Sequence, residues 1–205
     1  VDDIMMIGRH KLVIQEFKSQ LSKKFHIKDM GEATDYLGIE IERDRAAGTL
    51  KIHQSRYCRS LLSKYGMDEC NPSRIPIQEG TKLTMDQPDK QILDEEGIHR
   101  YQSIIGSLTY AMQGTRPDLA YAVSLCSRFL AKPTVVHMGI AKGVLRYLKG
   151  ATDLGIIYRR DNAENLFVYT DSNYQDRTLR GDGRSTSGYG VYLAGGLILW
   201  SLRRS

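Results

Sequence analysis

The sequence predicts an α+β protein in which strands and helices occupy separate stretches of the chain. Apolar and polar residues alternate over residues 36–43, which is the period of a half-buried strand. Residues 101–150 instead carry apolar side chains at helical spacing, and residues 166–201 return to short β-type runs with glycine between them. We therefore expect a first sheet, a small bundle of helices and a second sheet, in that order.

The chain begins VDDIMMIG, with two adjacent aspartates before a short apolar run. Residues 4–7 are predicted to form a strand, and the aspartates suit the turn before it, because an Asp side chain can bond its own backbone. Two neighbouring carboxylates also supply the hard oxygen ligands that a divalent cation prefers. From the residues alone, both interpretations of Asp2 and Asp3 stay open.

The first 66 residues are predicted to follow the order β-α-β-β-α. An amphipathic helix over residues 12–25 comes after the first strand, because apolar residues recur there at helical spacing. The strand over 36–43 is paired with a second strand by the hairpin AAGTLKIHQ. Ser55 is expected to cap a helix over 56–65 that Gly66 ends in a left-handed conformation.

Residues 71–97 are polar and proline-containing, so they are predicted to be a connector with little regular structure. Three helices are expected next: residues 101–113, a helix capped by Thr115, and a helix capped by Thr134. Gly150 is predicted to stop the third helix. Gly139 and Gly143 lie inside that helix and each costs about 1 kcal/mol relative to Ala, so we expect another backbone to pack closely there.

The last part of the chain is predicted to be β-structure. Residues 166–170 form one strand, and two more strands join at Gly195 and Gly196. Trp200 is expected in the core. No further helix follows to cover this sheet, so one face and at least one edge are expected to be exposed, with a risk of aggregation.

Composition and charge exclude several classes of protein. The 205 residues are 41% hydrophobic and 26% charged, as in a folded globular protein. The net charge of +5 is compatible with binding to phosphates but does not require it. The three cysteines show neither a disulfide framework nor zinc spacing, and we find no membrane span and no secretory leader. An intracellular protein is expected. Because no methionine precedes Val1, we expect a piece of a longer chain.

Several phrases, in this order along the chain, resemble the reverse transcriptase to ribonuclease H region of the Pol polyprotein of copia-type LTR retrotransposons. They are VDDI at 1–4, DYLGIEI at 35–41, QSRYCRSLLSKYGM at 54–67, YQSIIGSLTYAMQGTRPDLAYAV at 101–123, VLRYLKG at 144–150, YTDSN at 169–173 and RSTSGY at 184–189. Each phrase is weak evidence by itself, whereas together they cover nearly the whole chain.

The resemblance implies that residues 1–75 are the C-terminal part of a polymerase palm. Asp2 would be the metal-binding carboxylate and Asp3 its companion, and the intact parent would use two Mg²⁺ ions for phosphoryl transfer. Tyr36, Leu37 and Gly38 resemble the primer-grip hairpin, which positions the primer end. An ordinary strand and turn explains each of these three residues equally well.

The resemblance further implies a linker and helical thumb or connection over residues 76–158. Lys142, Arg146 and Lys149 would there contact the phosphates of a primer-template or RNA/DNA hybrid. A solvated helix face explains these three cations equally well. The other partners implied are the remaining segments of the Pol polyprotein, in the cytoplasm, a virus-like particle or the nucleus.

Residues 159–205 resemble the first strands of a ribonuclease H-like domain. Asp171 matches its first active-site carboxylate, which also holds metal ions. Asn173 stands where relatives often carry a second acidic residue, and the loop that holds Asp176 and Asp182 departs from the family, so these positions receive no role.

Neither active site is expected to be complete in this stretch of sequence, since each needs further carboxylates. The parent is thus expected to be an RNA-directed DNA polymerase with ribonuclease H activity, and the fragment by itself to be inactive. Two alternatives remain: a non-catalytic nucleic-acid-binding remnant or subunit, and an unrelated α+β scaffold in which the aspartate doublet is only a turn.

Overall fold

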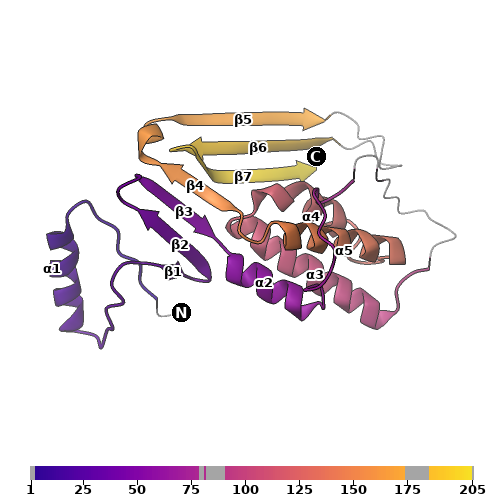
Figure 1. Ribbon diagram of the computed structural model, residues 1–205, viewed down its shortest axis with the longest axis horizontal. Coiled ribbons are helices and arrows are strands. Elements are labelled where there is room, and N and C mark those ends of the chain that lie inside the picture. The colour runs from indigo at the N-terminus through magenta and orange to yellow at the C-terminus, as the bar shows by residue number, and fades with distance from the viewer. Residues whose placement is uncertain (1–2, 79–80, 82–90, 174–184, 205) are drawn as a thin grey trace.

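The structure is a computed structural model that describes residues 3–78, 81, 91–173 and 185–204. It confirms the α+β fold class (Figure 1). The elements in chain order are α1 (Lys11–Ser22), β1 (Asp35–Tyr36), β2 (Ile39–Asp44), β3 (Thr49–His53), α2 (Ser55–Lys64), α3 (Glu95–Gly114), the 3₁₀ turn η1 (Pro117–Leu119), α4 (Ala120–Ser127), α5 (Val135–Gly150), β4 (Gly155–Arg159), the 3₁₀ turn η2 (Arg160–Asn162), β5 (Leu166–Asn173), β6 (Thr186–Leu193) and β7 (Gly196–Arg204).

The strands form two antiparallel sheets, ordered β1-β2-β3-β4 and β5-β6-β7. The three strands of the second sheet and the β2–β3 hairpin confirm the sequence prediction. Strand β4 was not predicted, because its five residues form a short apolar run without alternation. It pairs with β3 in the register Gly155↔His53, so the chain returns to the first sheet after the helices.

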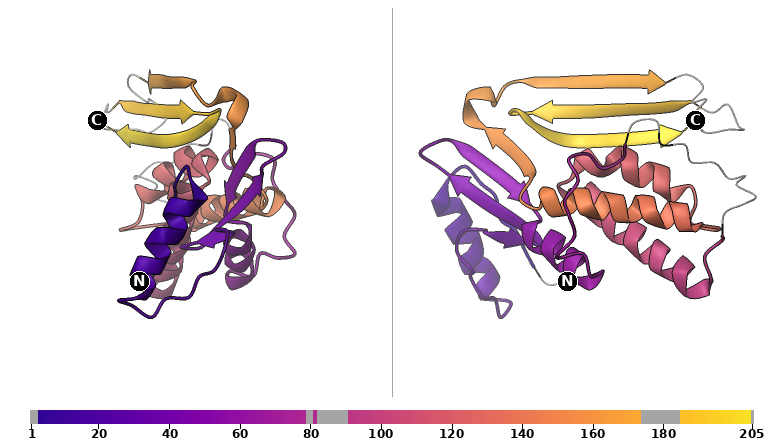
Figure 2. Two further views of the ribbon diagram at one scale, coloured as in Figure 1. Left: turned by 90° about the vertical axis from the view of Figure 1, so that its left-hand side faces the viewer. Right: turned by 45° about the vertical axis from the view of Figure 1, so that its right-hand side comes forward.

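Helices α2 to α5 pack into one core beneath the second sheet (Figures 1 and 2). Its centre contains Tyr101, Leu108, Leu145 and Leu148, all fully buried. The helical spacing of apolar residues that predicted these helices is what places such side chains on one face. Most of the apolar residues that this spacing predicts for the three later helices are buried in the core, whereas Met112, Leu130 and Ile140 are only partly buried against it.

Several predicted boundaries are wrong, and each has a local cause. Helix α3 begins at Glu95 rather than 101, because the Asp94 carboxylate accepts the Gly97 N–H at 2.9 Å and caps the helix. Thr115 ends α3 and donates its hydroxyl to Gln54 Oε1 at 3.1 Å instead of capping α4. Ser55 is the first residue of α2, not its cap. Thr134 does cap α5, and Gly66 has the expected left-handed φ of 67°.

The strand predicted over residues 4–7 does not form. No described strand pairs with these residues, and without a partner an extended segment cannot satisfy its backbone groups within a sheet. Ile4 and Ile7 are exposed. Helix α1 forms as predicted but buries none of its residues, and it lies apart from the helical core (Figure 1).

The close packing expected at Gly139 and Gly143 is also wrong, since a Cβ at either position would have no neighbour within 4 Å. Gly139→Ala is therefore expected to raise the free energy of unfolding by about 1 kcal/mol, because alanine restricts the unfolded chain and favours the helix.

Gly114→Ala should instead lower the free energy of unfolding by about 1–3 kcal/mol, because the new Cβ would lie 2.3 Å from the buried Gln54 Oε1. Urea unfolding of the two variants tests both signs, and a loss at Gly139 would contradict the open helix face.

Burial protects two of the three thiols. Cys58 and Cys126 are in the core, and burial raises the pKa of both, that of Cys126 to about 11. Since only the thiolate is nucleophilic, we expect iodoacetamide at pH 8 to modify Cys70 in the folded protein, and the other two cysteines only after denaturation. Intact mass spectrometry counts the adducts, with Cys70→Ser as the control. Alkylation of Cys126 without denaturant would contradict the packing.

Within the described residues, none of the helices is both long and apolar enough for a membrane span.

Trp200 is half-buried rather than in the core, because it lines a groove beside the second sheet.

Candidate functional site

The predicted carboxylates do not converge among the described residues. Asp2 lies outside them, Asp3 is exposed, and Asp171 is exposed on β5, opposite Gly188 of β6. No group of three or more His, Cys, Asp or Glu side chains in the described part of the chain is placed to hold a metal ion. A site for two Mg²⁺ ions needs several carboxylates close together, so the described residues do not form a complete two-metal site.

The β1–β2 hairpin tip, residues Tyr36, Leu37 and Gly38, has a strained backbone. Tyr36 pairs with Ile39, leaving Leu37 and Gly38 as a two-residue turn with φ of 51° and 80°. Positive φ at both positions is the geometry of a tight type I′ turn, which glycine adopts freely and leucine does not. Holding Leu37 there costs about 1–2 kcal/mol, although its side chain is half exposed.

Helix α3 holds this tip in place. The Tyr110 hydroxyl donates to the Leu37 carbonyl at 3.0 Å, and a Cβ at Gly38 would lie 3.2 Å from the same hydroxyl. The Tyr110 ring packs edge-on against Tyr57, whose own hydroxyl donates to the Ser107 carbonyl at 3.0 Å. The hairpin tip therefore has a fixed position relative to the helical core. Sequence reasoning missed Tyr110, which lies off the apolar stripe of its helix.

The base of the hairpin caps helix α2. The Glu40 carboxylate on β2 accepts the backbone N–H of Arg56 at 2.8 Å and the Arg56 Nε at 3.1 Å, while the same guanidinium pairs with Asp35. A carboxylate at a helix N-terminus satisfies a free N–H and opposes the positive end of the dipole. Glu40 thus takes the capping role that the sequence assigned to Ser55.

Two of the three predicted phosphate contacts have a structural role. Arg146 Nε donates to the Asn71 carbonyl at 2.7 Å, and Lys149 donates to the Asp68 carbonyl. Both bonds fasten the segment after α2 to helix α5. Lys142 is exposed on the same helix, as Arg146 is, but within the described residues its side chain makes no hydrogen bond or ion pair that would compete with a phosphate.

Sequence reasoning missed the ion pair between Arg116, which is fully buried, and Asp118, whose side chain is 31% exposed. Arg116 is 0% exposed, and its Nε and Nη2 donate to the Asp118 carboxylate at 2.9 and 2.7 Å. Its Nη1 donates to the Ala151 carbonyl at 2.7 Å, and the Tyr147 hydroxyl donates to Asp118 at 2.9 Å. Burial alone would lower the pKa of Arg116, but the bonds and charge of Asp118 outweigh it and raise the pKa. This cluster joins η1 to the end of α5.

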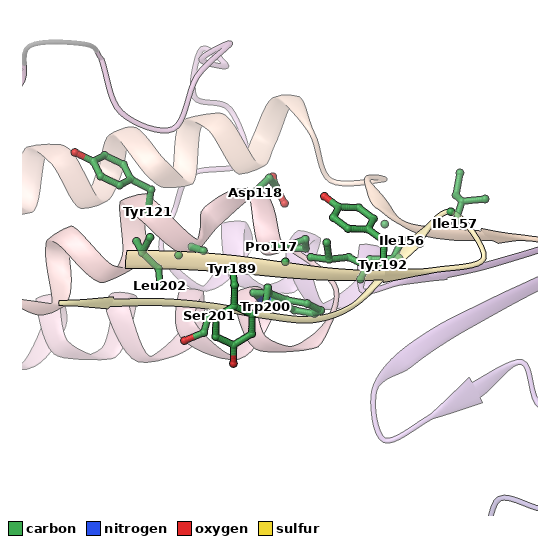
Figure 3. Close-up of a pocket in the computed structure, with 17 residues that line it drawn as sticks. Pro117, Asp118, Tyr121, Ile156, Ile157, Tyr189, Tyr192, Trp200, Ser201 and Leu202 are labelled. Atoms are coloured by element: carbon green, nitrogen blue, oxygen red, sulfur yellow. The ribbon is translucent and has the colours of Figure 1, made fainter. Parts of the chain in front are cut away.

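A groove of about 620 Å³ separates η1 and α4 from strands β6 and β7. Figure 3 shows Asp118 and Tyr121 on its helical side and Tyr192 and Leu202 projecting from the sheet. A second hollow of about 510 Å³ lies beside Asp171 and is also lined by Ser187 and Arg203. Asp171 is therefore accessible, and Arg203 is a cation among its described neighbours.

The family model described as reverse transcriptase (RNA-dependent DNA polymerase) matches residues 1–79. The chain is 34% identical, over 98% of its length, to the retrovirus-related Pol polyprotein from transposon TNT 1-94 of Nicotiana tabacum. It is 35% identical over its whole length to that of transposon RE2 of Arabidopsis thaliana.

The chain spans only 15% and 13% of these two polyproteins. It is also 31% identical to the uncharacterized mitochondrial protein AtMg00810 of Arabidopsis thaliana, covering all of this chain and 81% of that protein. No solved structure matches.

Proposed function

We propose that this chain is a part of an RNA-directed DNA polymerase with ribonuclease H activity. The premise is that the chain belongs to the reverse transcriptase-containing Pol family of copia-type retrotransposons. The polymerase would require further Pol segments besides this one. The observation that carries the proposal is the strained hairpin tip at Leu37 and Gly38, which lies inside the matched residues 1–79.

The hairpin tip suits the role of a primer grip. Backbone strain of this kind persists only where the surrounding structure enforces it, and it is common at functional sites. Here Tyr110 supplies that enforcement from α3. A rigid, exposed tip can hold the end of a primer strand in a fixed position, and such positioning contributes a large part of catalysis in phosphoryl transfer.

Membership of the reverse transcriptase family implies a divalent metal in the intact enzyme. We propose that this metal is Mg²⁺ and that Asp2 and Asp3 are among its ligands, with the other carboxylates supplied by further Pol segments. Residues 1–75 then form the last part of the palm. Since the described residues alone offer no complete ligand set, the chain by itself is expected to be inactive.

We propose a ribonuclease H role for residues 159–205, with Asp171 as one carboxylate of that site. Its exposure beside the 510 Å³ hollow supports this assignment. The helices within residues 76–158 would serve as thumb and connection, with Lys142 as a contact to the phosphates of an RNA/DNA hybrid. Strand β4 joins this helical segment to the palm sheet through β3.

Primer extension tests the proposal. The purified chain with Mg²⁺, nucleotides and a primed RNA template should extend no primer, while a longer Pol protein that contains this chain should do so. Extension by the chain alone would contradict the incomplete site. Absence of extension by the longer protein would contradict the polymerase proposal itself.

Binding of a labelled RNA/DNA hybrid distinguishes the non-catalytic alternative. Two results together would favour a nucleic-acid-binding role: the affinity of the chain for the hybrid falls steeply with salt, and the longer protein shows no activity. Lys142→Ala should then reduce the salt dependence, whereas Lys24→Ala on the outlying α1 segment serves as the control.

A further inference from the structure

The turn between β6 and β7 lies against β4 of the first sheet (Figures 1 and 2). The Arg159 N–H of β4 donates to the Ala194 carbonyl in this turn at 2.7 Å. The Tyr158 hydroxyl donates to the Leu197 carbonyl near the start of β7 at 2.9 Å. Within the described part of the chain, these two hydrogen bonds connect residues 166–204 to the residues before them. Hydrogen bonding therefore joins the two described sheets at this turn.

The packing at this contact is too close for a side chain at Gly196. A Cβ there would lie 2.5 Å from Cδ1 of the Tyr158 ring and 2.9 Å from the Ile157 carbonyl oxygen. The neighbouring Leu197 is 8% exposed and Ile156 is 6% exposed, so apolar burial stabilises the contact as well. We call this contact the sheet joint, which consists of Tyr158, Arg159, Ala194, Gly196 and Leu197.

The second sheet is packed less closely along the rest of its boundary with the helices. A groove of about 620 Å³ lies between η1 and α4 on one side and β6 and β7 on the other. Figure 3 shows Tyr192 and Leu202 projecting from the sheet at this groove. Among the described residues, the sheet joint is therefore the tightly fitted part of this boundary, and it lies at one end of the sheet.

We propose that the sheet joint positions the second sheet, and Asp171 with it, relative to the first sheet. The inference rests on the ribonuclease H role proposed above for residues 159–205. Strands β5, β6 and β7 are hydrogen-bonded to one another, so Asp171 on β5 moves together with the turn between β6 and β7. Tyr158 and Gly196 are thus positioning residues, which act on Asp171 through the sheet.

A fixed joint matters for a hybrid that is long enough to contact both sheets. The turn at Leu37 and Gly38, proposed as the primer grip, belongs to the first sheet, and Asp171 belongs to the second. A duplex held at the first sheet is presented to Asp171 at a high effective concentration, which falls when the connection becomes flexible. A short hybrid that reaches only Asp171 gains nothing from the joint. The length of the hybrid therefore distinguishes positioning from a general effect on folding.

Pulsed electron paramagnetic resonance on the purified chain measures the joint directly. Nitroxide labels at Ala46→Cys, in the turn between β2 and β3, and at Val168→Cys on β5 report the distance between the sheets on a Cys70→Ser background. Both labelled residues are exposed. The chain should give one narrow distance distribution. Gly196→Ala should broaden the distribution, because the new Cβ needs space that the Tyr158 ring occupies.

Gly190→Ala is the matched control, and Tyr158→Phe is the milder test. A Cβ at Gly190 would lie 3.2 Å from Leu197 Cδ1 and 3.3 Å from Tyr192 Cε2, which are side-chain atoms within the same sheet, so the joint should stay closed. Tyr158→Phe keeps the ring and removes one hydrogen bond, so it should broaden the distribution less than Gly196→Ala does. An unchanged distribution in Gly196→Ala, or equal broadening in Gly190→Ala, would overturn the proposal.

Cleavage of labelled RNA/DNA hybrids by a longer Pol protein tests the functional consequence. Gly196→Ala should slow cleavage of a long hybrid by about tenfold, while cleavage of a short hybrid and primer extension stay unchanged. A variant that is only less well folded would lose all three activities together. Gly190→Ala should change none of them.

The two hybrids also separate failure of this inference from failure of the proposed function. An equal loss on long and short hybrids in Gly196→Ala, or a loss on neither, would overturn the positioning role. Absence of cleavage of either hybrid by the unsubstituted longer protein would contradict the ribonuclease H proposal instead, and the distance measurement would then decide whether the sheet joint holds the two sheets together.

Discussion

Asp118→Asn is expected to lower the free energy of unfolding by about 2–3 kcal/mol, less than the loss of a fully buried counter-charge because Asp118 is 31% exposed. The substitution keeps the shape of the side chain but removes the charge that faces the fully buried Arg116 guanidinium. Arginine stays protonated in proteins, so the variant would have to bury a cation without its counter-charge. The loss should be seen in urea or thermal unfolding, with native-like circular dichroism before the transition.

The pair Arg59–Asp153 is the matched control for this prediction. It joins the same kinds of side chain at 2.9 Å, but Arg59 and Asp153 are 57% and 73% exposed. Exposed pairs contribute about 0–1 kcal/mol, so Asp153→Asn should change stability little. Equal losses of unfolding free energy in Asp118→Asn and Asp153→Asn would contradict the view that the burial of Arg116 makes its counter-charge important for stability.

Gly38→Val in a longer Pol protein is expected to reduce primer extension by about ten- to a hundredfold. A β-branched residue opposes the positive φ of 80° at this position, and its Cβ would lie 3.2 Å from the Tyr110 hydroxyl. The tip would shift away from α3, and the primer end that it is proposed to hold would shift with it. Single-turnover extension on a primed RNA template measures the effect.

Gly31→Val separates this positional effect from simple backbone strain. Gly31 also has a left-handed φ, of 79°, but a Cβ there would have no neighbour within 4 Å. Both substitutions should cost stability through the left-handed φ, while only Gly38→Val, which also meets Tyr110, should lower the extension rate. A similar loss of activity in both variants would count against the primer-grip role.

The helices and hairpins could be predicted because their signals are local. Apolar residues at helical spacing placed Ile104, Leu108 and Leu148 in a core that the structure confirms. Alternation and glycine turns likewise predicted β2, β3 and the second sheet. Helix ends were less predictable, because caps such as Glu40 come from another element and have no signal in the helix itself.

The remaining features depend on contacts between distant residues. Strand β4 exists because β3 offers it an edge, and Gly155 permits the close approach to the Ile52 carbonyl. Arg116 has no local pattern that indicates burial, yet it is the most deeply buried charge in the described core. The carboxylate roles of Asp2, Asp3 and Asp171 rest on family resemblance and stay predictions.

The most direct test of the proposed function is a pair of assays on a longer Pol protein that contains this chain. Asp2→Asn should abolish primer extension and retain cleavage of the RNA strand in a hybrid, since it removes a ligand from the polymerase site alone. Asp171→Asn should do the reverse. Loss of both activities in both variants, or of neither, would contradict the assignment of these aspartates to two separate metal-dependent sites.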